Sequence, residues 1–409
     1  MRQLRSYAKL RAIHEQKLMP IATKAQNSIL EHAMILIGVS LRGYPSTIQA
    51  FRLAQYNNTK NSIHAECIDP RKNQEHVLDM LEESLVQYMN RCKKMGSAPQ
   101  IWIPNRSALR MWEALCDRLS YTQKHAPLCS ILQFTTQRQY YAGSQTFLAI
   151  SHVLKQHFVT GQPDTEDEAL ETWVQWFHNA PVPPINHCYT FLPESLETNN
   201  PIREDIIPVL EAETHRRLLL AQQTLHLFSQ YGPPLISSFV DWWQQDLQYF
   251  QAFCAHPNTT QPDPLPLAAQ KFEEREFTQD NYLADLRRED AAFFYGALLE
   301  GHCLEGIVHQ IQGQNIHILC NQPIIRAREG DSLVNRTHPS DQYRIIDSKW
   351  TEEGYLVLLK KHFGKISCSL HSKIQLTPHA MGWKFQHQRR KNLSHRIQQT
   401  GWIHKEEPS

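Results

Sequence analysis

Glycine is scarce in this chain, which has 15 glycines among 409 residues, whereas average usage would give roughly 29. The sequence contains neither Gly-x-x-x-x-Gly-Lys-Ser/Thr nor Gly-x-Gly-x-x-Gly. It therefore lacks the glycine-rich loops with which P-loop ATPases and dinucleotide enzymes hold phosphates. No other cofactor fingerprint is present, and we expect no cofactor.

Long apolar runs and paired cysteines are also missing. The most apolar run near the N-terminus, residues 33–39, is far shorter than the roughly 18 residues of a membrane span. The nine cysteines are odd in number and scattered along the chain, unlike a disulfide framework. These features predict a cytoplasmic protein with reduced thiols and no membrane segment.

Apolar residues recur at helical spacing through most of the first three quarters of the chain. This spacing predicts helices within 3–39, 71–94, 144–160, 203–230, 235–254 and 267–300, with a polar, turn-rich stretch at 44–69. The predicted fold class is α+β and multidomain, with a predominantly helical N-terminal three-quarters. The predicted domains are a helical domain (1–180), a proline-rich linker (181–203), a bundle or arm of long helices (204–300), a small β-barrel (301–380) and a basic aromatic tail (381–409).

The period of the sequence changes at residue 304, because apolar and polar residues then alternate as they do in half-buried strands. Six strands are predicted, at 305–312, 315–320, 324–328, 344–349, 355–363 and 365–376. Turn residues around Gly313, Gly330 and Gly354 separate them. Short antiparallel strands in so small a region predict a closed barrel of the OB or SH3-like sort.

Cysteine and histidine pairs in the barrel region raise the possibility of a metal site. His317 and Cys320 share the spacing of a zinc knuckle, and so do Cys368 and His371. In a strand, however, residues three apart lie on opposite faces. We therefore expect buried cysteines and exposed histidines here, and no metal.

Three residues of the same region suggest nuclease chemistry. Asp331 is followed by Asp347-Ser-Lys349, and a metal-dependent phosphodiesterase needs carboxylates to hold Mg²⁺ and a lysine to activate water. This order resembles the Asp…(Asp/Glu)-x-Lys pattern of the restriction-endonuclease-like superfamily. The resemblance covers these three residues and implies a metal-dependent nuclease centred on Asp347 and Lys349.

The C-terminal tail is basic and aromatic. Cations neutralise nucleic-acid phosphates, and exposed aromatic side chains stack on unpaired bases. The residues expected to do so are Trp383, Lys384, Arg389, Arg390, Lys391 and Arg396. We therefore expect a non-catalytic, helical scaffold or adaptor whose barrel and tail contact DNA, RNA or a nucleic-acid-bound partner.

Two alternatives to this function stay open. One is the nuclease. The other is a pure protein-interaction adaptor that docks through the aromatic helix around Trp242 and Trp243, although we expect these two tryptophans to be part of the core.

Overall fold

The computed structural model describes residues 2–41, 44–67, 74–122, 124–179, 206–257, 265–362 and 366–379. Within the chain, contacts define two compact units. The larger comprises Tyr7–Ile21 and Ala25–Pro262, and the smaller comprises Met1–Ser6, Ala22–Lys24 and Asp263–Ser409. The predicted tail residues Trp383, Lys384, Arg389, Arg390, Lys391 and Arg396 lie outside the described residues.

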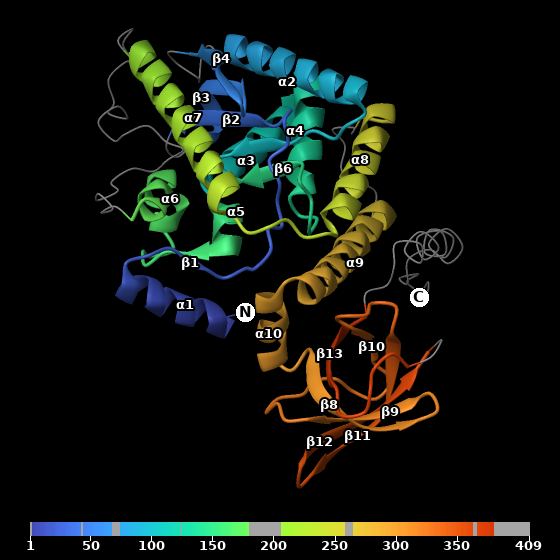
Figure 1. Ribbon diagram of the computed structural model, residues 1–409. Helices are drawn as coiled ribbons and strands as arrows, with labels where there is room; N and C mark the ends of the chain where they lie inside the picture. Colours follow the sequence, from blue (N-terminus) through green and yellow to red (C-terminus); the bar gives the residue numbers. More distant parts are fainter. Residues whose placement is uncertain are drawn as a thin grey trace, which may run out of the picture. The chain divides into compact units, whose positions relative to one another are not determined.

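A five-stranded mixed sheet forms the centre of the larger unit (Figure 1). Its order is β4 (Asn58–Glu66), β3 (Tyr44–Gln55), β2 (Met34–Leu41), β5 (Ile101–Ile103) and β6 (Phe147–Ala149). The first three strands in sequence form an antiparallel meander, and β5 and β6 then run parallel to β2. Parallel neighbours need crossover connections, which α2 (Glu75–Met95), α3 (Arg106–Thr122) and α4 (Ala126–Arg138) provide.

The predicted helical fold of the N-terminal three-quarters is therefore wrong. After α1 (Arg2–Glu15) the chain forms β1 (Met19–Pro20) and then β2, where a helix was expected. The stretch predicted as polar turns contains β3 and β4, and the helix predicted after Ser144 begins with β6. The physical reason is that β2 is buried on both faces. Its side chains enter two different cores, so its sequence shows a continuous apolar run without alternation.

Helices cover both faces of this sheet. On one face, α2, α3 and α4 with α8 (Phe239–Ala255) enclose a core that contains Phe51 and Trp112. On the other face, α5 (Ile150–His157), α6 (Leu170–Phe177) and α7 (Ile206–Tyr231) enclose a core with Trp102 and Trp173. Figure 1 shows α7 lying across β2 and β3. The shorter elements β7 (Phe158–Val159), which pairs with β1, and η1 (Glu166–Glu168) complete the unit.

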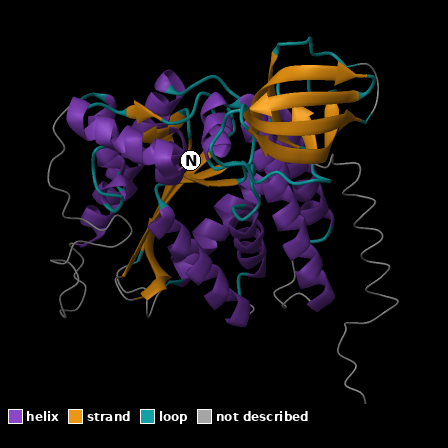
Figure 2. Ribbon diagram, turned by 90° about the horizontal axis from the view of Figure 1, so that it is seen from below, coloured by secondary structure: helices purple, strands orange, loops and turns teal. Residues whose placement is uncertain are grey.

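The smaller unit contains two helices and the barrel. The helix predicted at 267–300 is divided at Asp290 into α9 (Leu265–Glu289) and α10 (Ala291–Leu299). The predicted closed barrel is confirmed (Figure 2). Its strand order is β10-β11-β12-β9-β8-β13. Its strands are β8 (Leu304–Gln312), β9 (Asn315–Cys320), β10 (Ser332–Asn335), β11 (Gln342–Thr351), β12 (Gly354–Lys361) and β13 (Lys373–Pro378).

Two of the six predicted barrel strands differ from those observed. Residues 324–328 form no strand, and the short β10 after Gly330 takes that place in the barrel. The last strand is restricted to β13, since residues 366–372 run as loop and turn. Gly313, Gly330 and Gly354 all have positive φ, as tight turns between strands require.

Candidate functional site

The outer wall of the barrel brings together most of the residues that the sequence singled out there. The wall is the solvent side of the neighbouring strands β11, β12, β9 and β8. A β-bulge in β11 leaves Ile346 without a partner between Ile345 and Asp347. Because of this extra residue, Asp347 and Lys349 lie on the same side of the strand as Arg344.

Two cations face each other directly across this wall. Arg344 of β11 is in register with Lys360 of β12, and both side chains are exposed. Neither side chain has an ion pair or hydrogen bond with any described residue of the chain, and the same holds for the exposed Lys349. Like charges directly opposite on neighbouring strands destabilise a sheet, so an anion bound at Arg344 and Lys360 would relieve this repulsion.

Aliphatic side chains occupy the centre of the same wall. Lys349 is in register with Leu356, which pairs through Leu319 with Ile307. Ile307 is 50% exposed, while Leu319 and Leu356 are half-buried. The wall therefore combines separate cations and the exposed carboxylate of Asp347 with an apolar strip that water reaches.

An aromatic pair lies at the end of the β11–β12 hairpin, on the opposite side of the strands from Lys349 and Leu356. Trp350 is 62% exposed, and its ring centroid lies 4.9 Å from that of Tyr355, its partner across the hairpin. The Tyr355 hydroxyl donates to Ser348 Oγ at 2.7 Å, which fixes the ring. The turn beyond carries Glu352 and Glu353, both exposed, so a path for a polyanion would end there.

The three nuclease candidates do not form a metal site among the described residues. The Asp331 carboxylate accepts from the Arg328 backbone N–H at 2.8 Å, and the Asp347 carboxylate accepts from the Ser348 N–H at 2.8 Å. Asp331 lies beside Ile345 at the start of β10. No group of three or more His, Cys, Asp or Glu side chains within the described part of the chain is arranged to hold a metal ion.

The first Cys/His pair lies on opposite faces of β9, whereas the second lies in the loop and turn before β13, where a strand was expected. Cys320 is fully buried in the barrel core, where burial raises the pKa of its thiol to about 12, and His317 is on the outer wall. Cys368 packs half-buried against the core, and burial raises its pKa as well. His371 is exposed in a turn with φ of 63°.

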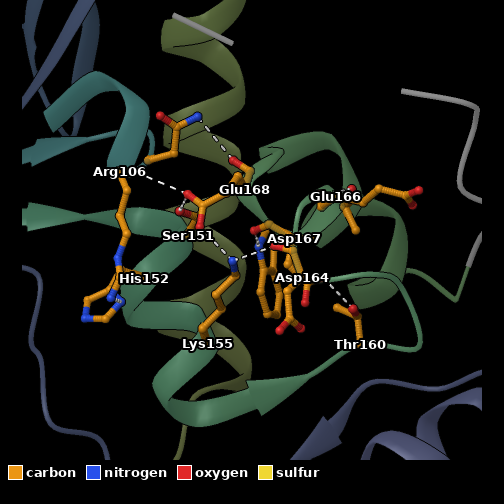
Figure 3. Close-up of polar contacts among 12 residues, drawn as sticks. Arg106, Ser151, His152, Lys155, Thr160, Asp164, Glu166, Asp167 and Glu168 are labelled. Carbon is orange, nitrogen blue, oxygen red and sulfur yellow. Dashed lines mark hydrogen bonds and ion pairs between the residues drawn. The ribbon is translucent and has the colours of Figure 1, made fainter. Parts of the chain in front are cut away.

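Sequence reasoning missed a polar cluster in the larger unit, at the carboxyl ends of β5 and β6 (Figure 3). In α/β sheets this edge is the usual place for ligands. The Glu168 carboxylate accepts from the Ser151 hydroxyl at 3.0 Å, the Arg106 backbone N–H at 3.3 Å and the Lys155 ammonium at 2.7 Å. Asn105 caps α3 by accepting from the Ala108 N–H at 2.9 Å.

This cluster acts as a structural cap rather than as a reactive site. Burial alone would raise the pKa of Glu168, but the hydrogen bond and charge of Lys155, with the other donors, outweigh it and lower the pKa. The ionised carboxylate therefore occupies the place at the helix N-termini where an external anion would bind. Lys155 is also bonded to the Asp164 carbonyl at 2.9 Å. Pairwise partners of this kind depend on the fold, and no local sequence pattern marks them.

Comparison of the chain with known protein families, with curated proteins and with solved structures gave no match. Among the helices in the described ranges, none combines the length and the apolar character that a bilayer crossing requires. The function must therefore be argued from the chemistry of the sites themselves.

Proposed function

We propose that the protein binds single-stranded nucleic acid on the outer wall of its barrel, with the basic tail that begins near Lys384 adding further phosphate contacts. In this proposal the protein is a binding component and catalyses no reaction. The observation that carries the proposal is the opposed, unneutralised pair Arg344 and Lys360. A phosphate between the two side chains would turn an unfavourable juxtaposition into two favourable contacts.

The spread of cations favours a polymer over a small anion. Lys349 lies on the same wall as Arg344, separated from it along β11 by the bulge and several residues. A strand rises about 3.3 Å per residue, so one small anion could not reach both ends of this wall. A chain of phosphates could contact them in succession.

The apolar strip favours a single strand over a duplex. A duplex presents its phosphates outward and keeps its bases stacked inside, so it would leave Leu356 and Ile307 against a charged backbone. The unpaired bases of a single strand could cover these side chains.

The test is a binding titration of labelled single- and double-stranded DNA and RNA at several salt concentrations. We expect wild-type protein to bind single strands more tightly than duplexes of the same length. The double variant Arg344→Ala/Lys360→Ala should lose two phosphate contacts. The negative slope of log association constant against log salt concentration should therefore become shallower by about 1.4. Arg110→Ala, which removes an exposed cation of α3, is the matched control and should change nothing.

Separate outcomes would contradict separate parts of the proposal. An unchanged affinity and salt slope in the double variant would remove the wall as the binding surface. If a chain truncated after residue 380 binds as tightly as the full chain, the tail makes no contact. Mg²⁺-dependent cleavage that disappears in both Asp347→Ala and Lys349→Ala would replace the binding role with the nuclease.

A further inference from the structure

A groove in the larger unit lies between α2, α8 and the N-terminal turn of α4. It consists of two hollows of about 400 Å³ and about 250 Å³. Both hollows have Lys93 and Cys254 in their lining, so they adjoin at these two residues. The larger hollow is lined chiefly by apolar side chains, including Val86, Met89 and Ile131. Its volume is within the range of small-molecule sites.

Charge in this groove is confined to one point. Among the described residues that line the two hollows, Lys93 carries a charge and the others are uncharged. No carboxylate is among these described residues. Lys93 is exposed in the last turn of α2, and the described residues give it no ion-pair partner. A ligand that matches this lining has an apolar body and a single negative charge.

We propose that this groove binds a small amphipathic acid, with its carboxylate at Lys93 and its hydrocarbon chain in the larger hollow. The occupant is a medium-chain aliphatic carboxylate rather than a second protein. Charge complementarity to Lys93 selects the head group, and the apolar lining selects the chain. This site is separate from the barrel and does not depend on the nucleic-acid proposal.

The first experiment measures the affinity of full-length protein for hexanoate, octanoate and decanoate by calorimetry, together with decan-1-ol. Each pair of added methylenes that enters the hollow should raise the affinity by up to about 15-fold, until the hollow is full. Decanoate should bind about two- to fivefold more tightly than decan-1-ol, because an ion pair at an exposed lysine is weak.

Two neighbouring lysines provide a matched pair of variants. Lys93→Gln should bind decanoate and decan-1-ol equally, because it removes the charge that distinguishes them. Lys94→Gln, one residue further along α2 and outside both linings, should keep the wild-type preference. Ala126→Trp places a large ring in the larger hollow from an exposed position at the start of α4, so it should abolish binding without disturbing the core.

Thiol labelling gives a readout that does not rely on affinity. Cys254 and Cys368 are the half-buried cysteines among the described residues, and the remaining described cysteines are buried. Decanoate should slow maleimide labelling of Cys254, as measured by peptide mass spectrometry, and leave labelling of Cys368 unchanged.

The proposal is overturned if decanoate does not bind at millimolar concentration. It is also overturned if decan-1-ol binds wild-type protein as well as decanoate does, or if decanoate leaves the labelling of Cys254 unchanged. Loss of the carboxylate preference in Lys94→Gln as well as in Lys93→Gln would equally contradict the assigned head-group position.

Discussion

Replacement of Asp290 should destabilise the smaller unit more than any exposed substitution there, because its fully buried carboxylate joins two segments. Oδ1 caps α10 by accepting from the Ala292 and Phe293 N–H groups at 2.8 and 3.3 Å. Oδ2 accepts from the N–H groups of Thr23 and Lys24 at 2.8 and 2.9 Å. Thr23 and Lys24 belong to the part of the N-terminal region that is assigned to this unit.

The loss of stability expected on replacement of Asp290 follows from these contacts. Loss of a helix cap costs about 1 kcal/mol, and each partly buried N–H left without an acceptor adds about 1 kcal/mol or more. Asp290→Ala should therefore lower the free energy of unfolding by about 2–4 kcal/mol. Asp290→Ser keeps a capping oxygen for α10 but cannot reach both N–H groups of the other segment, so it should recover only the cap.

Urea unfolding would measure the total loss of stability. Hydrogen exchange would separate the contribution of the α10 cap from that of the contacts to Thr23 and Lys24. In Asp290→Ala the amides of Thr23, Lys24, Ala292 and Phe293 should all exchange faster, whereas Asp290→Ser should restore protection at Ala292 and Phe293 alone. Equal stability of wild type and Asp290→Ala, or restoration of all four amides by serine, would refute the reasoning.

Three further substitutions test other contacts. Burial alone would raise the pKa of Glu213, but its hydrogen bonds and ion pairs with Arg216 and Arg217 lower it to about 2. Its contribution is therefore present above about pH 4.5 and lost as the pH falls toward 2, so Glu213→Gln should flatten the acid side of a stability–pH curve. Asp246→Asn should lower the free energy of unfolding by about 3–5 kcal/mol, as measured by thermal unfolding, because it leaves the buried guanidinium of Arg138 without its carboxylate. Gly306→Ala should destabilise the barrel by about 1–3 kcal/mol, since a Cβ there would lie 2.7 Å from the Leu319 carbonyl oxygen. An unchanged melting temperature would contradict either of the last two expectations.

The barrel could be predicted from the sequence because water reaches one side of its strands, so their polar and apolar residues alternate. The five-stranded sheet could not, because its central strand is buried on both sides. In β9 the side chains of Ile316, Ile318 and Cys320 are buried while His317 is partly exposed, which produces the alternation that the sequence shows. In β2 the side chains of Ile35 and Leu36 are both fully buried, in opposite cores. No polar residue marks the period there, so a run of this length is as compatible with a helix as with a strand.

β3 was missed for a related reason. Arg52 is 6% exposed although it is charged, because its guanidinium donates to Ser62 Oγ at 2.8 Å and to the Glu211 carbonyl at 3.4 Å under α7. From the sequence alone, a charged residue within the segment favours a solvent-exposed turn. The partner in α7, more than 150 residues away in the sequence, and Ser62 of β4 together make its burial tolerable.

The wall of the barrel shows how one extra residue limits what alternation can predict. With strict alternation, Arg344, Ile346 and Ser348 would share one face of β11, and Asp347 and Lys349 would point into the barrel with Ile345. The bulge at Ile346 reverses this assignment, so that Asp347 and Lys349 join Arg344 outside and Ser348 pairs with the buried Val357. The sequence could therefore single out Asp347 and Lys349 but could not place them beside Arg344 and Lys360. Deletion of Ile346 should restore the alternation. Because Ile345 and Asp347 already pair with the adjacent residues Leu359 and Leu358, Lys349 would stay on the outer wall, and the deletion should preserve the affinity for single strands, as Ile346→Val should. A loss of that affinity in the deletion variant would contradict the assigned register.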